Sequence, residues 1–407
     1  MYKRQKKWNN VYRLSINLKE KVNPAVLQAA AEHTLKRFLN FKFQLKRGVF
    51  WYYFEPVDKD VRIERDVKNP CGSLNLHKRD DYLFRIRYYD RRIALEVFHS
   101  ITDGTGALIF LKTLTAEYLR LLGHTIPCEK GILDLKEPIK ETELEDAYAR
   151  YCKMQAVNSR KDNRAYLPSG KLIDDRDILI VTGIMSAEEV LKAAHDKKVS
   201  LTEYLTGLYI YSILCMQKDE PVKKNRKRPV KVAVPVSMRK FYPTDTLRNF
   251  LLFINVGIDP TYGEYSCDEI INLVHHYMRY NINEKNLNAQ MSANIKNERT
   301  LILKLMPLFI KNIGMSAAYG FVGENRYTST LSNLGDVDLP EQMKQHVDRL
   351  DFILGRSREN RMACGILSYD GKLVINFSRC IRSARCEKEF FRHLVNQGIH
   401  VKTESNY

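Results

Sequence analysis

One short stretch combines the residue types that acid–base chemistry needs. The segment EVFHSITDG, residues 96–104, places a histidine at the end of an apolar strand, with an aspartate four positions later and a glycine directly after it. Histidine ordinarily exchanges a proton near neutral pH, so an imidazole held in one orientation can act as a general base. The competing interpretation is a structural His–Asp contact, because motifs this short often match by chance.

The residues before His99 indicate where its ring points. Ile93, Leu95 and Val97 share one side of the predicted strand, and His99 continues that set. We therefore expect the imidazole to face the interior where the strand ends. Gly104 allows the backbone to turn closely into the helix that follows.

Asp103 has two interpretations from the sequence. It could orient the imidazole directly, or it could fix the loop through a salt bridge with an arginine. The other histidines point less clearly to chemistry; the pair at 275–276 lies in a predicted helix, where packing or a surface position is the favoured interpretation. The eight cysteines are scattered without a CxxC pair, so we expect reduced thiols and neither a disulfide framework nor a metal site.

Composition and charge limit the class of protein. The 407 residues are 44% hydrophobic and carry a net charge of +18, enough apolar content for two domains or one large two-lobed unit. Basic clusters at 3–7 and 223–228 have no interleaved aromatic residues, and no nucleic-acid motif is present. A solvated basic surface is the favoured interpretation, and attraction of an anionic cofactor, substrate or membrane surface is the alternative.

No segment is typical of export or membrane insertion. The N-terminal residues are basic but lack the apolar run of a signal peptide. The most apolar segment, 301–321, is interrupted by Lys304, Pro307 and Lys311, which favours a buried or amphipathic helix over a membrane span. These observations predict a cytoplasmic protein without integral membrane contact.

Hydrophobic periodicity predicts an α+β fold in two similar halves. A helix at 23–41, capped by Asn23, precedes a hairpin that turns at Gly48, two alternating strands at 81–100 and a helix at 105–123. The second half repeats this layout, with capping boxes at Ser186, Ser200 and Ser266. We expect one long helix from 266 toward 299, a hairpin turn at Asp370-Gly371, and a last helix near 384–397. Strands and helices do not alternate strictly, which favours two lobes, each a mixed sheet packed with helices.

Residues 99–104, HSITDG, resemble the HxxxDG motif of the chloramphenicol acetyltransferase-like superfamily, which includes condensation domains and stand-alone acyltransferases. The segments VPVSMRKFYPTDTLRNF (234–250) and TLSNLG (330–335) resemble later stretches of the same superfamily in the same order. Phe98 stands where condensation domains usually carry a second histidine, and no carrier-attachment sequence or adenylation module is present. The resemblance is therefore greatest to stand-alone bacterial alcohol acetyltransferase-like members.

The resemblance implies two pseudo-symmetric lobes with a tunnel between them. The expected division is an N-terminal lobe at 1–150 with the motif, a connecting region at 151–175 and a C-terminal lobe at 176–407. It implies that His99 is the catalytic base and that Asp103 pairs with an arginine of the second lobe. Arg239 is the expected partner, with Arg248 in reserve. Gly104 leaves space for the donor's pantetheine arm.

Acyl transfer from a coenzyme A thioester to a hydroxyl or amine is the activity that the resemblance implies, with acyl-CoA, most simply acetyl-CoA, as co-substrate. No metal and no permanently bound cofactor are expected. Ser332 and Asn333 are the candidates for oxyanion or tunnel contacts. An acyl carrier protein is the alternative donor, and an inactive binding protein of the same fold is the non-enzymatic alternative. The two lobes in one chain favour a monomer.

Overall fold

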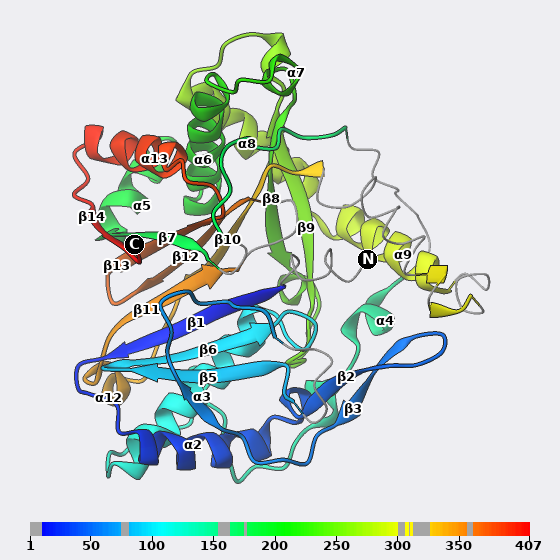
Figure 1. The fold of residues 1–407 in the computed structure, drawn as a ribbon, viewed down its shortest axis with the longest axis vertical. Coiled ribbons are helices and arrows are strands. Elements are labelled where there is room, and N and C mark those ends of the chain that lie inside the picture. Colours follow the sequence, from blue (N-terminus) through cyan, green and yellow to red (C-terminus); the bar gives the residue numbers. More distant parts are fainter. Residues whose placement is uncertain are drawn as a thin grey trace.

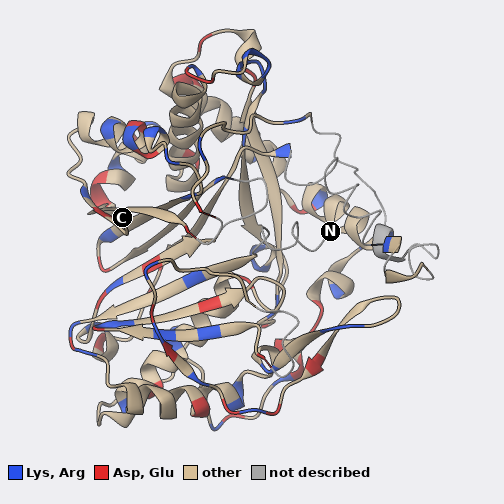
Figure 2. Cartoon of the chain, in the orientation of Figure 1, with Lys and Arg blue, Asp and Glu red and all other residues tan. Residues whose placement is uncertain are grey.

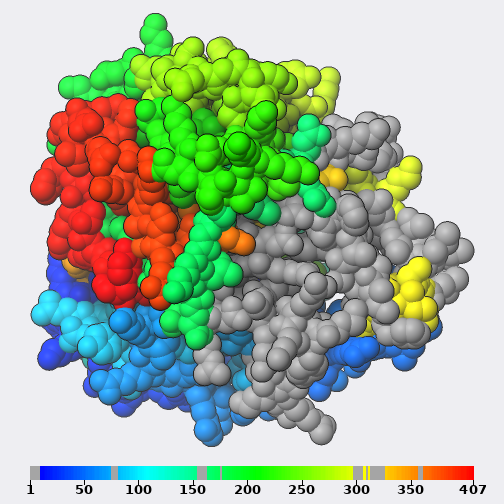
Figure 3. Space-filling model, turned by 45° about the horizontal axis from the view of Figure 1, so that its top comes forward, coloured from blue at the N-terminus to red at the C-terminus, as the bar shows by residue number. Residues whose placement is uncertain are grey.

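The computed structural model is a two-lobed molecule (Figure 1). The residues that it describes are 10–74, 81–153, 163–174, 177–299, 306–308, 310–311, 326–355 and 361–407. Each lobe contains a large β-sheet covered by helices, and Figure 3 shows the C-terminal segments, in orange and red, packed against the N-terminal lobe in blue. The architecture is the α+β arrangement in two lobes that the sequence predicts.

The N-terminal lobe is built on a five-stranded sheet in the order β11-β1-β6-β5-β4. The pairs between its first four strands are antiparallel, and β4 adds to β5 in parallel. The strands are β1 (Val11–Leu18), β4 (Ile63–Arg65), β5 (Phe84–Tyr89), β6 (Arg92–Phe98) and β11 (Val347–Leu354). Because β11 comes from the range assigned to the C-terminal lobe, residues 1–150 alone do not complete this sheet.

Two helices cover one face of this sheet, α2 (Pro24–Arg37) and α3 (Gly104–Leu121) (Figure 1). Asn23 caps α2 through its side-chain oxygen, which accepts from the amides of Ala25 and Val26, and proline occupies the first helical position. The helices and the sheet enclose a core that includes Phe38, Phe41 and Phe110. The apolar stripe of α3 and the inward residues of β6 thus bury each other.

The C-terminal lobe contains a seven-stranded mixed sheet in the order β14-β7-β13-β12-β10-β8-β9. β10 runs parallel to both β12 and β8, whereas the other neighbours are antiparallel. The strands are β7 (Leu179–Ser186), β8 (Val230–Ser237), β9 (Leu251–Ile258), β10 (Ser329–Asp336), β12 (Met362–Tyr369), β13 (Lys372–Arg379) and β14 (Lys402–Ser405).

Helices α5, α6, α8 and α13 pack on the seven-stranded sheet and form the second core. Their bounds are α5 (Ala187–Asp196), α6 (Leu201–Gln217), α8 (Cys267–Asn281) and α13 (Arg385–Asn396). Ser200 and Ser266 form complete capping boxes with Glu203 and Glu269. At Ser186 only half of the predicted box is present, because its side chain accepts from the amide of Glu189 without a return bond.

The remaining elements lie outside the two large sheets and the helices described so far. They are β2 (Phe43–Arg47), β3 (Tyr52–Pro56), α4 (Ala147–Tyr151), α7 (Lys223–Arg226), α9 (Glu284–Arg299) and α12 (Glu341–Lys344), with 3-10 turns at Leu39–Phe41, Glu141–Leu144, Met238–Lys240 and Pro260–Tyr262. Basic residues are spread over both lobes (Figure 2).

The single long helix expected from 266 toward 299 is wrong. The structure has two helices, α8 and α9, separated at residues 282–283. Asn283 explains the break, because its side-chain oxygen accepts from the amide of Asn286, 3.0 Å away, and so starts a new helix. Asparagine favours such local bonds over a continuous helical ladder.

Within the described residues no single helix is long and apolar enough to cross a membrane. One pair, α5 with α6, reaches the required length and composition together but bends by 84° at its break. All eight cysteines are free thiols.

Candidate active site

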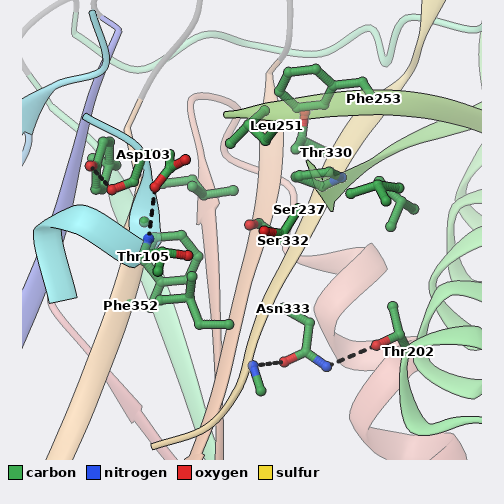
Figure 4. Close-up of a pocket in the computed structure, with 18 of the residues that line it drawn as sticks. Asp103, Thr105, Thr202, Ser237, Leu251, Phe253, Thr330, Ser332, Asn333 and Phe352 are labelled. Carbon is green, nitrogen blue, oxygen red and sulfur yellow. Dashed lines mark hydrogen bonds between the residues drawn. The ribbon is translucent and has the colours of Figure 1, made fainter. Parts of the chain in front are cut away.

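A cavity of about 960 Å³ lies between the two lobes and is lined by residues of both. The N-terminal sheet contributes Tyr12 and Phe352, and the C-terminal lobe contributes residues such as Ser237, Leu251 and Ser332 (Figure 4). A space of this size can hold a drug-sized ligand together with several waters. His99 is on its wall.

His99 follows directly after β6 and is half-buried. Its amide donates to the carbonyl of Asn10 at 2.8 Å, which fixes the backbone where the strand ends. Asn249 then holds the residue from two directions: its Nδ2 donates to the His99 carbonyl at 2.6 Å, and its Oδ1 lies 3.1 Å from the ring Nδ1. The imidazole is thereby held in one orientation.

These two bonds also define the protonation pattern of the ring. The side-chain nitrogen of Asn249 donates to the His99 carbonyl, so the side-chain oxygen is the atom that faces Nδ1. Because an amide oxygen can only accept, Nδ1 carries the hydrogen of this bond. In the neutral imidazole the other nitrogen, Nε2, then carries the lone pair. The arrangement provides a proton acceptor at the cavity wall.

Tyr12 packs against the His99 ring, with the two ring centroids 4.8 Å apart. Its hydroxyl donates to the carbonyls of Asp103 and Thr102, at 2.9 and 3.1 Å. Burial raises the pKa of Tyr12 well above its ordinary value, and the carboxylate of Asp103 adds to the effect. Tyr12 therefore remains a neutral phenol that supports the ring of His99.

Both carboxylate oxygens of Asp103 accept hydrogen bonds from other parts of the protein. Its Oδ1 accepts from the amides of Thr105 and Gly106, at 3.1 and 3.2 Å, and so caps α3. Its Oδ2 accepts from Arg239 Nη1 at 2.7 Å and from the amide of Phe250 at 2.9 Å. Of the two interpretations of Asp103, the structure shows the salt bridge with an arginine.

Arg239 joins the two lobes through this contact. Besides Asp103 it donates from Nη2 to the carbonyls of Thr246 and Arg248, at 2.8 and 2.7 Å. The Arg248 side chain points elsewhere, to the carbonyl of Leu144 at 3.3 Å. The expected partner of Asp103 is thus the observed one, and the reserve residue does not take its place.

Gly104 lines the cavity. An added Cβ would approach Leu334 Cδ2 to 2.6 Å, so the side chain of Leu334 fills part of that space. Gly106 is more restricted, because a Cβ there would lie 2.1 Å from Thr102 Oγ1 and 2.4 Å from the carbonyl oxygen of Leu247. The helix start is therefore in direct contact with the chain that leads to Asn249.

The two candidates for oxyanion contacts, Ser332 and Asn333, differ in the hydrogen bonds that their side chains make. Ser332 lines the cavity, as does Ser237 (Figure 4). Asn333 also lines it, but its amide is engaged at both ends, with Thr202 Oγ1 at 3.0 Å and the amide of Gly335 at 2.8 Å. Ser332 is the better placed of the two to donate to a ligand.

Sequence reasoning did not single out Asn249 or Tyr12. Asn249 lies inside the segment 234–250 that carries the resemblance, but nothing in the sequence indicates its contact with His99. Tyr12 alternates with Leu14 and Ile16 along β1 and is indistinguishable from a core residue by pattern. Among the described residues, no group of three or more His, Cys, Asp and Glu side chains is arranged to hold a metal ion.

No protein-family model and no curated protein matches the chain. Solved structures do. F. sporotrichioides TRI101, complexed with coenzyme A and T-2, is 11% identical with a TM-score of 0.57 and covers 98% of this chain and 97% of its own. The starter condensation domain of rhizomide synthetase RzmA, solved with C8-CoA, is 13% identical with a TM-score of 0.57 over 96% and 91%. The epimerization domain of tyrocidine synthetase B is 11% identical with a TM-score of 0.57 over 97% and 92%.

These similarities extend over nearly the whole chain and define its fold. The protein has the two-lobed chloramphenicol acetyltransferase-like fold shared by condensation domains.

Proposed function

We propose that the protein transfers an acyl group from a coenzyme A thioester to a hydroxyl or amine, with His99 as the general base. The observation that carries the proposal is the Asn249–His99 contact, which leaves Nε2 as the proton acceptor on the wall of a large inter-lobe cavity. A general base needs this combination of fixed orientation and access.

The proposed step is a nucleophilic substitution at the thioester carbonyl. Nε2 of His99 takes the proton of the acceptor as its oxygen or nitrogen forms a bond to the carbonyl carbon. The resulting oxyanion requires a donor, and the Ser332 hydroxyl, which lines the cavity, is the candidate. The C–S bond then breaks, and the imidazolium returns its proton to the leaving thiolate. Asp103 and Arg239 hold the site together without touching the reacting atoms.

Coenzyme A as the donor is supported by charge and by the structural relatives. The chain carries a net charge of +18, which favours approach of a polyanionic co-substrate. TRI101 is solved with coenzyme A and the starter condensation domain with C8-CoA. Apolar residues of the cavity wall, including Val236, Leu251 and Phe253, suit an acyl chain.

The fold alone does not select this reaction, because an epimerization domain shares it. Acetyl transfer to an alcohol is the simplest form of the proposed reaction. A carrier-protein thioester is the alternative donor. The open cavity favours an enzyme over an inactive binding protein, since a degenerate member has no need for access to His99.

The test measures thiol release from acetyl-CoA and longer acyl-CoAs with a panel of alcohols and amines. The His99→Ala variant is expected to lose activity by about 10²- to 10⁴-fold, the usual contribution of a general base. His195→Ala, which removes an exposed histidine of α5, is the matched control and should retain activity. Undiminished turnover in His99→Ala contradicts the mechanism, and activity only with a loaded carrier protein identifies the alternative donor.

A further inference from the structure

An apolar run is exposed at the tip of the β2–β3 hairpin. Residues 49–54, VFWYYF, each leave between 38% and 71% of their surface exposed. Within the part of the chain that the structure describes, the two strands pair only with each other, and they extend to the side of the N-terminal lobe, away from both large sheets (Figure 1). A contiguous apolar surface of this kind marks an interaction site, because leaving it in water costs free energy.

The tip is held in position by a distant part of the chain. The amide of Leu308 donates to the carbonyl of Val49 at 2.8 Å, and Lys311 Nζ donates to the carbonyl of Phe50 at 2.9 Å. The same ammonium lies 3.3 Å from the centre of the Trp51 ring. These contacts hold the backbone of the tip and the ring of Trp51 in place, so binding does not have to order the hairpin.

Basic residues lie along one strand of this hairpin. Lys42 directly precedes β2 at the base of the hairpin, and Lys46 and Arg47 end β2 next to the tip. Lys311, which is only 3% exposed, lies against Trp51. The hairpin itself carries one acidic residue, Glu55, which pairs with Lys46 at 3.3 Å. The tip therefore combines aromatic side chains with a local excess of positive charge.

We propose that the tip of the β2–β3 hairpin docks on the surface of an anionic lipid membrane as a peripheral contact. Trp and Tyr are the side chains that favour the boundary between headgroups and acyl chains. Lys and Arg beside an inserted apolar surface add attraction to anionic lipids. The aromatic residues alone would suffice to bind a protein partner. The nearby basic residues Lys42, Lys46 and Arg47 are in addition complementary to a negatively charged surface. The proposal is independent of the acyl-transfer chemistry.

Trp51 permits a direct measurement. The chain has two tryptophans, and the Trp8→Phe variant leaves Trp51 as the only one; Trp8 lies outside the described residues. With vesicles of phosphatidylcholine and phosphatidylglycerol at about three to one, the Trp51 emission should shift to shorter wavelength and be quenched by brominated acyl chains. Vesicles of phosphatidylcholine alone should give a much weaker response, and added salt should reduce binding. An emission that does not change with anionic vesicles overturns the proposal.

Matched variants separate the hairpin from the general basic charge of the chain. The aromatic variant W51S/Y52S/Y53S is compared with Y89S/Y262S/Y280S, three tyrosines that are 52%, 82% and 76% exposed elsewhere. The charge variant K42Q/K46Q/R47Q is compared with K223Q/K224Q/K227Q, which removes three charges at α7.

Vesicle co-sedimentation should show at least about a tenfold loss of partitioning for the aromatic variant. At about one kcal/mol for each basic residue near the membrane, the charge variant should lose about 100-fold. Both controls should stay within about threefold of the parent. Equal losses in hairpin and control variants overturn the proposal. It is also overturned if, without vesicles, sedimentation velocity shows a dimer that the aromatic variant abolishes, because the tip then joins two copies of the chain.

Discussion

Asn249 is the residue that turns His99 into an oriented base. It contacts both the carbonyl and the ring of His99, across 150 positions of the sequence. Because the two bonds use opposite ends of one amide, a rotation that breaks one also breaks the other. Asn249 acts through His99 and is a positioning residue in the proposed reaction.

Replacing Asn249 by alanine removes the orientation without removing the base. We expect kcat to fall about 100-fold, the effect of a small misplacement of a reacting group, with KM little changed. Asn249→Asp should instead move the acidic limb of the pH–activity profile to higher pH, because a carboxylate beside Nδ1 stabilises the imidazolium. Steady-state kinetics from about pH 5 to pH 9 measures both effects. A KM effect alone, with an unchanged pH profile, contradicts the positioning role.

The sequence located the residues that lie in short motifs and missed those defined by distant contacts. His99 and Asp103 lie in one segment, and the resemblance led from Asp103 to Arg239, a contact that the structure contains at 2.7 Å. Asn249 and Tyr12 have no motif of their own, and their importance follows from side-chain directions that only the packed lobes establish. Asn333 illustrates the converse: its position was identified, but its bonds to Thr202 and Gly335 could not be predicted.

At the scale of elements, the start of α3 is the most constrained part of the site. Asp103 caps this helix, and Gly104 and Gly106 follow in its first turn. The atoms that an added Cβ would contact differ between these two glycines. At Gly104 a methyl group faces the end of the flexible Leu334 side chain, whereas at Gly106 it faces a backbone carbonyl of the segment between Arg239 and Asn249.

The substitutions Gly104→Ala and Gly106→Ala therefore form a matched pair. Gly106→Ala should lower the free energy of unfolding by at least about 3 kcal/mol, because backbone cannot move aside as a side chain can. Gly104→Ala should cost less than about 1 kcal/mol and raise KM for acyl-CoA if the pantetheine arm passes this residue. Denaturant unfolding and steady-state kinetics measure the pair. Equal stability of the two variants contradicts the contact at Gly106.

Lys112 connects α3 to the segment after β10. It is 7% exposed, and its Nζ donates to the carbonyl of Lys130 and, at 3.0 Å, to that of Asp338. Burial lowers the pKa of Lys112 from 10.5 to about 8, with Lys130 adding to the effect and the Asp338 carboxylate opposing it. Since the folded pKa is below the unfolded one, the unfolded chain binds the proton more strongly between these values, and stability rises with pH.

The Lys112→Met variant isolates this group from all others that titrate. The difference in free energy of unfolding, parent minus variant, should increase by about 2 kcal/mol between pH 7 and pH 10. Urea unfolding of both proteins across this range measures it, and the comparison cancels the tyrosines and cysteines that titrate in both. A difference that is flat or falls with pH shows that Lys112 is solvated in the folded state.

Local chemistry explains which elements were predictable. The Asp370-Gly371 turn between β12 and β13 has positive φ at both residues, 49° and 73°, as a tight hairpin requires. The caps at Asn23, Ser200 and Ser266 are likewise local signals. The break between α8 and α9 was missed because the apolar periodicity continues across it, and only the side-chain bond of Asn283 decides where the helix restarts.

At the scale of the whole molecule, the two lobes share structure as well as a cavity. β11 pairs with β1 along Tyr12–Leu18, although the two strands are more than 300 residues apart, so the N-terminal sheet depends on the C-terminal part of the chain. Sequence periodicity identified β11 as a strand but could not assign it to a sheet, because pairing partners are not encoded in local pattern. The expected boundary at residue 150 is therefore a division of the sequence that the sheets do not follow.

A fragment of residues 1–150 should for this reason fail to fold alone. Without β11, the edge of β1 exposes unpaired amides and carbonyls beside Tyr12, and such edges lead to aggregation. Size-exclusion chromatography with light scattering should show large assemblies, whereas co-expression with residues 151–407 should give a soluble complex of both fragments that unfolds cooperatively. Since the cavity wall next to His99 includes Phe352 of β11, only the complex should recover thiol release from acyl-CoA. A monomeric 1–150 fragment with a cooperative unfolding transition would show that the pairing of β1 with β11 is dispensable for the lobe.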